Sequence, residues 1–137
     1  MKELRADVAI IGGGPAGLAA ALEAERLGKK PIILERDAEL GGILQQCIHD
    51  GFGLHRFGRH LSGSQYAQAF IDEVESKQIE CYLNTMVLEL TKDRTIYACN
   101  KTDGMLRIQA GAVILAMGCR ERTASQILLL ENGRRGS

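Results

Sequence analysis

The first third of the chain has the polarity pattern of a strand, a helix and a second strand. A continuous apolar run at Val8–Ile11 is typical of a strand buried on both faces of a parallel sheet. Alanines and leucines then fill a predicted helix that begins at Pro15 and ends at Leu27, just before Gly28. A second strand follows, which Pro31 opens and Ile32, Ile33 and Leu34 make apolar. The pattern therefore predicts a βαβ unit with two parallel strands.

The regular pattern of apolar residues stops in the middle of the chain. Residues 41–63 are rich in glycine and show neither helical nor strand periodicity over most of their length, which indicates a long ordered binding loop. Ser62 and Gln65 have the spacing of a capping box, and apolar residues then recur at helical intervals. We expect a second amphipathic helix that ends near Lys77.

The remaining segments alternate between polar and apolar positions and predict strands. We expect a third parallel strand at Ile79–Leu83, a small antiparallel meander at Met86–Leu90, Thr95–Cys99 and Met105–Gln109, and a buried strand at Ala112–Met117. The fold class is therefore α/β and Rossmann-like, with a parallel sheet of at least four strands and an antiparallel β-meander.

Composition narrows the possible partners. A length of 137 residues suits one domain, and 45% hydrophobic with 25% charged residues is ordinary globular usage. Seventeen basic residues balance seventeen acidic ones without a basic block, which argues against nucleic acid or an anionic membrane surface as the main partner. The four cysteines form no CxxC pair or zinc spacing, and the apolar run near the start is too short for a membrane span. We expect a cytoplasmic protein.

Between the first strand and the first helix lies a GxGxxG pattern formed by Gly12, Gly14 and Gly17. In this position such glycines permit a tight turn, a close approach to a pyrophosphate, and close packing of helix on strand. Glu35 ends the second strand, 23 residues after Gly12, where a carboxylate binds ribose hydroxyls and repels a 2′-phosphate. The pattern predicts a dinucleotide site, either NAD or FAD; the alternative is a glycine-rich turn without a ligand.

A second glycine pair favours FAD. Gly41-Gly42 follows Glu35-Arg36 after a few residues, and consecutive glycines let a chain pass close to a bulky ligand. The alternative is an ordinary turn.

Taken together, these motifs resemble the amino-terminal FAD-binding part of the pyridine nucleotide-disulfide oxidoreductase superfamily. The resemblance is carried by VAIIGGGPAGLAAA, Glu35-Arg36, Gly41-Gly42 and AVILAMGCRER, and it spans residues 6 to about 122. More narrowly, GGILQQCIHDGFGLHRF resembles a bacterial branch often associated with glycerol-3-phosphate dehydrogenase. We expect an FAD-binding domain at residues 1–122 and a tail outside the family pattern at 123–137, as in a truncated member.

The resemblance implies a role for each matching residue. The pyrophosphate would be bound by Gly12, Gly14, Pro15, Ala16 and Gly17, and the adenosine ribose by Glu35. The cofactor would then extend along Arg36, Gly41, Gly42 and Ile43, and its adenine would contact the backbone of Val87. The strand end would be formed by Ala116, Met117 and Gly118, with Met117 in place of the superfamily's threonine.

The family's redox cysteine pair is incomplete here. Only Cys47 falls after the glycine pair, and one thiol cannot close a CxxxxC disulfide. It is either a lone reactive thiol near the flavin or a buried packing residue. Three histidines, His49, His55 and His60, share this loop with Arg56 and Arg59, but their spacing fits no standard metal motif. We predict no metal site and assign no catalytic residue.

The chain lacks a second GxGxxG and the late Gly-Asp motif of the family. We therefore expect the FAD-binding portion of an oxidoreductase that passes hydride between NAD(P)H and an unknown acceptor, with NAD(P)H bound by a second domain or a partner subunit. Self-association is a further expectation, because a shortened core leaves apolar edge surface. The alternatives are a non-catalytic FAD-binding module and a single-domain NAD-binding protein.

Overall fold

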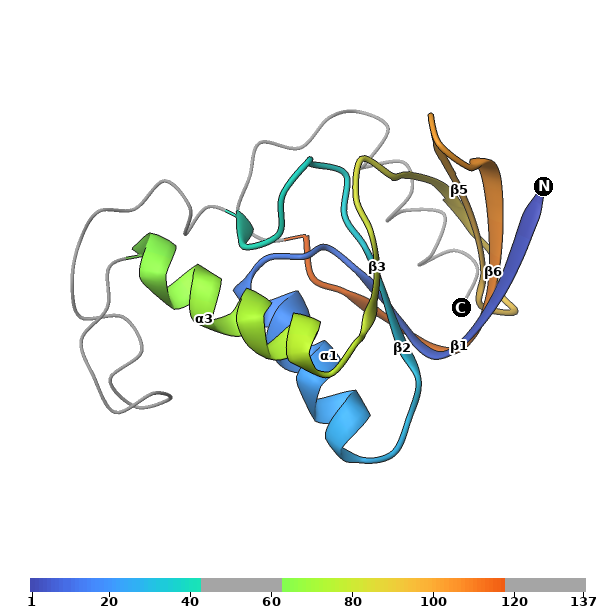
Figure 1. The fold of residues 1–137 in the computed structure, drawn as a ribbon. Coiled ribbons are helices and arrows are strands. Elements are labelled where there is room, and N and C mark those ends of the chain that lie inside the picture. Colours follow the sequence, from blue (N-terminus) through green and yellow to red (C-terminus); the bar gives the residue numbers. More distant parts are fainter. Residues whose placement is uncertain (43–62, 118–137) are drawn as a thin grey trace.

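The computed structural model describes residues 1–42 and 63–117 (Figure 1). Its elements in chain order are β1 (Lys2–Ile11), α1 (Pro15–Arg26), β2 (Pro31–Leu34), α3 (Gly63–Ser76), β3 (Glu80–Tyr82), β4 (Met86–Leu90), β5 (Thr95–Asn100) and β6 (Gly104–Leu115). The βαβ unit, the second amphipathic helix and the third parallel strand expected from the sequence are all present.

All the strands belong to one six-stranded sheet in the order β3-β2-β1-β6-β5-β4. Four neighbouring strands pair in parallel, in the order β3, β2, β1 and β6. Strands β5 and β4 extend the sheet beyond β6 as antiparallel strands. The predicted parallel sheet with an antiparallel meander is therefore confirmed. Because the strand order reverses direction at β1, the carboxyl end of β1 lies at the switch point where such folds bind ligands.

Two apolar clusters cover the two faces of the parallel strands. On one face, α1 and α3 pack over the sheet through residues such as Leu18, Phe70 and Val74 (Figure 1). On the other face, Ile96 and Ile108 of the curled meander pack against residues of β1 and β2. The central strands are buried on both sides, which explains their continuous apolar runs.

The last strands differ from expectation. The segments predicted separately at Met105–Gln109 and Ala112–Met117 form one strand, β6, because β1 begins at Lys2 and pairs with β6 along its whole length. Gly111 permits this pairing, since a Cβ there would lie 2.9 Å from the Asp7 carbonyl oxygen.

The expectation that the end of β6 is buried is wrong for the described part of the chain. The side chains of Ile114 and Leu115 are 38% and 44% exposed. The reason is that β5 pairs with β6 only as far as Gln109, and beyond that point β1 is its partner within the described residues.

Several sequence-based expectations lie outside the described residues: the binding loop at 43–62, with its cysteine and histidines, and the tail at 118–137. Among the residues that are described, no helix is long and apolar enough to cross a membrane.

Candidate cofactor site

The turn between β1 and α1 is held by close backbone contacts. The amide of Gly12 donates a 2.9 Å hydrogen bond to the Leu34 carbonyl, and Gly12 has a φ of +117°. A Cβ at Gly12 would lie 2.2 Å from the Ala116 carbonyl oxygen, and one at Gly17 would lie 1.9 Å from the Gly12 carbonyl oxygen. Both glycines are therefore required by the packing of the protein itself, with or without a ligand.

Gly14 is different, because among the described residues neither the backbone conformation nor a clash requires a glycine there. Its φ is −78°, which any residue adopts, and a Cβ would meet only the Gly42 Cα at 3.9 Å. No other described atom lies within 4 Å of that Cβ, so a small side chain fits the described packing. A ligand that approaches the backbone closely would require a glycine at such a position, even though the described backbone conformation and packing do not.

The amino terminus of α1 is open to an anion. Gly14 is the N-cap, it supplies no side-chain hydrogen bond, and the first turn, which begins at Pro15, has no acidic residue. The first N–H groups of a helix lack partners within the helix and carry the positive end of its dipole. A phosphate group fits this position.

The second glycine pair packs directly on the first. The Gly41 amide donates a 2.7 Å hydrogen bond to the Gly13 carbonyl, and a Cβ at Gly42 would lie 3.1 Å from the Gly14 Cα. Gly41 and Gly42 have φ angles of +103° and +59°, so each also occupies a backbone region that favours glycine. Two glycine motifs predicted from separate stretches thus form one surface.

Glu35 connects this surface to the end of β2. Its side chain is only 5% exposed, and its two carboxylate oxygens accept 2.7 Å hydrogen bonds from the amides of Gly13 and Asp37. A carboxylate has about four acceptor positions, so these two bonds orient it and leave acceptor capacity for hydroxyl donors. This is the chemistry that recognition of a ribose diol requires.

Other predicted residues fall around the same edge. The Ala116 amide donates a 2.8 Å hydrogen bond to the Ile11 carbonyl, which places Ala116 and the following Met117 beside Gly12. Arg36 is exposed next to Glu35. Val87 lies on β4 and packs against the cluster under the meander. Ile43 and Gly118 lie outside the described residues.

Sequence reasoning missed several residues that shape the site. Gly13 occupies a variable position of the glycine motif, yet a Cβ there would lie 2.5 Å from the Leu40 side chain and 3.2 Å from a Glu35 oxygen. Asp37 contributes the second amide that holds Glu35. The run of three glycines was a usable signal for Gly13, whereas the contribution of Asp37 is made by its backbone and leaves no signal in the sequence.

The described cysteines show no sign of redox chemistry. Cys81 and Cys99 are free thiols. Burial, with the nearby charge of Glu75, raises the pKa of Cys81 to about 11, which keeps it protonated and unreactive near neutral pH. Within residues 1–42 and 63–117, no cluster of histidine, cysteine or acidic residues could hold a metal ion.

A groove of about 570 Å³ lies between α1 and α3. Its walls come from the later turns of α1 and from α3, and its charged groups include Glu23, Arg26 and Lys77. Arg26 pairs with Glu23, and Lys77 pairs with Glu25. These ion pairs are exposed, so the groove lacks the buried, oriented polar groups found at the glycine turn.

The fold and the glycine turn define a dinucleotide-binding domain. The family model described as "Pyridine nucleotide-disulphide oxidoreductase" matches residues 6–135, so the chain belongs to that family. The match continues past residue 122, and our expected boundary there stays a prediction. Proteins of this family are FAD-dependent oxidoreductases, and FAD is confirmed as the cofactor class that the sequence indicated.

Individual relatives agree with this placement. The chain is 35% identical to a ferredoxin–NADP reductase of Streptococcus sanguinis over 123 residues, 86% of this chain and 36% of that protein. It is 29% identical to hydrogen cyanide synthase subunit HcnB of Pseudomonas protegens over 83% of this chain and 24% of that protein. The structure of L-proline dehydrogenase from P. horikoshii superposes with a TM-score of 0.74 at 23% identity, over 96% of this chain and 29% of that one. The chain therefore spans about a quarter to a third of these relatives.

Proposed function

We propose that this chain binds the adenosine diphosphate half of FAD at the glycine turn, as part of an oxidoreductase that passes hydride between NAD(P)H and an acceptor. The observation that carries the proposal is Gly14, because the described packing leaves room for a side chain there, whereas close approach of a ligand to the backbone would require a glycine. When bound, the flavin supplies the hydride and electron chemistry. The residues of this chain bind and orient the cofactor.

Each part of the turn has a distinct share in binding. The pyrophosphate lies on the α1 terminus formed by Gly14, Pro15, Ala16 and Gly17, below the turn made by Gly12. Glu35 accepts hydrogen bonds from the ribose hydroxyls through the acceptor positions that Gly13 and Asp37 leave unused. We place Arg36, Gly41, Gly42 and Ile43 along the cofactor and the backbone of Val87 at the adenine. We place Ala116, Met117 and Gly118 beside the turn.

Glu35→Gln tests the ribose contact. The amide would turn a donor toward the amide of Gly13 or Asp37 and would remove an acceptor for the ribose, so FAD affinity should fall about tenfold. Quenching of flavin fluorescence measures the affinity. Glu39→Gln is the matched control, because it makes the same charge change at an exposed position of the same segment. Equal FAD affinities for the two variants would remove Glu35 from the site.

NAD(P)H and the acceptor are proposed to bind elsewhere in the protein. The relatives extend well beyond the matched region, and one of them is by name a subunit of a larger enzyme. The exposed Ile114 and Leu115 at the end of β6 offer apolar surface for a second domain, a partner subunit or another copy of the chain. Light scattering of the 137-residue chain alone tests self-association.

The substrate and the compartment are further proposals. The resemblance of residues 41–57 to the branch associated with glycerol-3-phosphate dehydrogenase makes glycerol 3-phosphate the first electron donor to test. Its anaerobic addition should bleach the bound flavin of the whole protein, and unchanged absorbance would reject it. We also propose a reducing cytoplasm, which suits the free thiols of Cys81 and Cys99.

An absorbance spectrum tests the central proposal. The purified chain, loaded with FAD and passed through gel filtration, should retain the flavin bands, while NADH consumption with an artificial acceptor should stay low for this chain alone. A folded chain that retains no FAD would contradict the proposal. Retention of FAD without reduction in the whole protein would favour the alternative of a non-catalytic FAD-binding module, and retention of NAD alone would favour a single-domain NAD-binding protein.

A further inference from the structure

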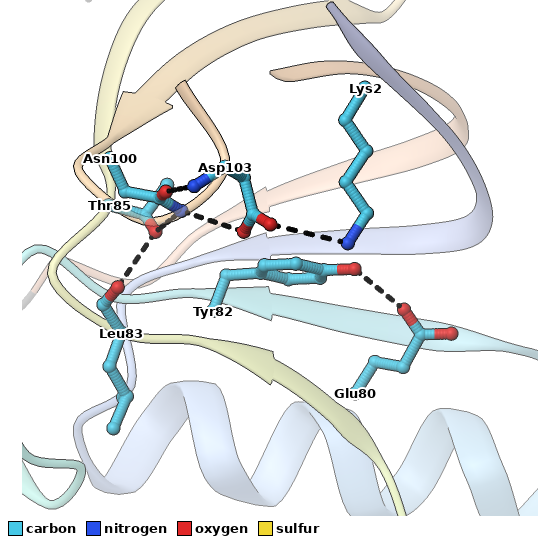
Figure 2. Close-up of polar contacts among 7 residues, drawn as sticks. All are labelled: Lys2, Glu80, Tyr82, Leu83, Thr85, Asn100 and Asp103. Carbon is cyan, nitrogen blue, oxygen red and sulfur yellow. Dashed lines mark hydrogen bonds and ion pairs between the residues drawn. The ribbon is translucent and has the colours of Figure 1, made fainter. Parts of the chain in front are cut away.

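A network of buried and half-buried polar groups ties the β5–β6 turn to the segment between β3 and β4 (Figure 2). Asn100 ends β5, and its side-chain oxygen accepts a 2.6 Å hydrogen bond from the amide of Asp103 within the turn. Its side-chain nitrogen donates to Thr85 Oγ1 at 3.0 Å and to an Asp103 carboxylate oxygen at 3.3 Å. Asn100 thereby joins the turn to the segment between β3 and β4.

Thr85 is the buried end of this network. It is 1% exposed, and its hydroxyl donates a 2.9 Å hydrogen bond to the Leu83 carbonyl while it accepts the bond from Asn100. The hydroxyl therefore has both a donor and an acceptor partner away from water. Loss of either partner would leave a buried polar group unpaired, which costs more than an exposed hydrogen bond.

Backbone hydrogen bonds connect residues 82–85 to the backbone around Glu35. The Thr85 amide donates a 2.9 Å hydrogen bond to the Glu35 carbonyl, and the Glu35 amide donates a 2.8 Å bond to the Tyr82 carbonyl. One residue earlier, the Asn84 amide donates a 2.9 Å bond to the Asp37 carbonyl. The backbone on both sides of the Glu35 carboxylate is thus held by residues 82–85.

The exposed contacts of the same network contribute less. Lys2 lies 3.5 Å from Asp103 and 5.3 Å from the centre of the Tyr82 ring, and the Tyr82 hydroxyl donates to Glu80 at 3.2 Å (Figure 2). Nearly half of the Lys2 side chain is in solvent, where such pairs are weak. The bond between Asn100 and the buried Thr85 is therefore the side-chain contact on which the inference rests.

We propose that Asn100 and Thr85 are positioning residues for the adenosine end of the cofactor site. Both act on the ribose site through Glu35. The side-chain amide of Asn100 holds the Thr85 hydroxyl, and the backbone amide of Thr85 holds the Glu35 carbonyl. These bonds keep Glu35 where its carboxylate binds the ribose beside the glycine turn. The inference rests on the proposed contact between Glu35 and the ribose.

The test compares ADP with 2′-deoxy-ADP as competitors of FAD for the protein freed of its cofactor. The ratio of their inhibition constants reports the ribose contact alone, because a general loss of stability weakens both competitors equally. We expect the wild-type protein to prefer ADP about tenfold, as one charge-assisted hydrogen bond would give. Thr85→Val keeps the shape but removes the hydroxyl, and should reduce the preference to about twofold or less. Thr85→Ser restores the hydroxyl and should restore the preference.

Asn100→Asp provides a second variant at a half-buried position in case Thr85→Val does not fold. It keeps the acceptor for the Asp103 amide but removes the donor to Thr85, so it should also reduce the preference for ADP. Lys2→Met is the control, and its preference should equal that of the wild type.

The outcomes separate two kinds of failure. No preference for ADP in the wild-type protein would overturn the ribose contact of Glu35, and the positioning role with it. A preference in the wild type that survives in both Thr85→Val and Asn100→Asp would overturn the positioning role alone.

Discussion

The three glycines of the GxGxxG turn face different constraints at the scale of single residues. Gly17 lies against the Gly12 carbonyl and Gly12 against the Ala116 carbonyl, so both serve the packing of α1, β1 and β6. Among the described residues, a Cβ at Gly14 would contact only the Gly42 Cα, at 3.9 Å. Substitution of these glycines should therefore separate stability from cofactor binding.

Gly14→Ala should fold but bind FAD poorly. Alanine at an N-cap costs less than about 1 kcal/mol relative to glycine, because φ is already negative and the Cβ would make only an ordinary 3.9 Å contact with Gly42 among the described residues. The added methyl group would meet the pyrophosphate, so we expect an affinity loss of at least about tenfold. Urea unfolding and flavin fluorescence measure the two effects. FAD affinity equal to that of the wild type would contradict the assignment of Gly14.

Gly17→Ala is the matched variant with the opposite expectation. A Cβ at 1.9 Å from a carbonyl oxygen forces the backbone to move, so this variant should lose several kcal/mol of stability, about the cost of severe overpacking. A Gly17→Ala protein as stable as the wild type would show that the turn is looser than described.

Cys81 should behave as an inert thiol. In a variant with serine at Cys47, Cys99 and Cys119, alkylation of Cys81 at pH 8 should be about 100-fold slower than for an ordinary thiol, because its pKa is about 11 instead of 9.0. The stabilisation from the neutral thiol is fully present below pH 9.0 and is lost as pH rises through about 11. Fast alkylation of the folded protein at pH 8, equal to that in urea, would refute the buried environment.

The element with the largest structural role is β6. Its first half pairs with β5, and Leu106–Leu115 pair with β1, so one strand joins the meander to the parallel strands. Ala116 follows its last residue, Leu115, and the Ala116 carbonyl lies against Gly12 of the glycine turn. The position of the turn therefore depends on how closely β1 and β6 approach.

Gly111→Ala tests that approach. A Cβ at 2.9 Å from the Asp7 carbonyl oxygen would push the two strands apart, and we expect a loss of about 1–3 kcal/mol in the free energy of unfolding. The neighbouring Ala112→Ser is the control, since position 112 is exposed and should change stability by less than about 0.5 kcal/mol. Equal stabilities in a chemical unfolding experiment would show that the strands accommodate a side chain.

The sequence was sufficient for some elements and not for others. The apolar runs at Val8–Ile11 and Pro31–Leu34 predicted their strands because both faces are buried. The polar first half of β1 has no such run, and it is a strand only because β6 pairs with it. For the same reason two predicted strands proved to be a single long one.

For the molecule as a whole, cofactor and fold should be coupled. The glycine turn draws on β1, α1, the segment after β2 and the end of β6, so a ligand bound there stabilises contacts between all of them. Occupancy at a concentration 100 times the dissociation constant adds about 2.7 kcal/mol to the free energy of unfolding.

Thermal unfolding measures this coupling. FAD at saturating concentration should raise the melting temperature of the chain by roughly 5–15 °C. FMN, which has no adenosine and no pyrophosphate, is the comparison, and its effect should be smaller. An equal shift with FMN would mean that the glycine turn does not carry the affinity.

The sequence by itself determined the βαβ unit, the two glycine motifs, the acidic residue after the second strand, and through them the cofactor class. These features depend on local periodicity and on backbone conformations that favour glycine, and both are visible in short stretches of sequence. Only the tertiary structure decided that Gly42 lies on Gly14, that the amides of Gly13 and Asp37 hold Glu35, and that Thr85 fixes the backbone of Glu35. Those contacts join segments far apart in the chain. Many of them are made by backbone atoms, which every residue has, so the residue types in the sequence do not predict them.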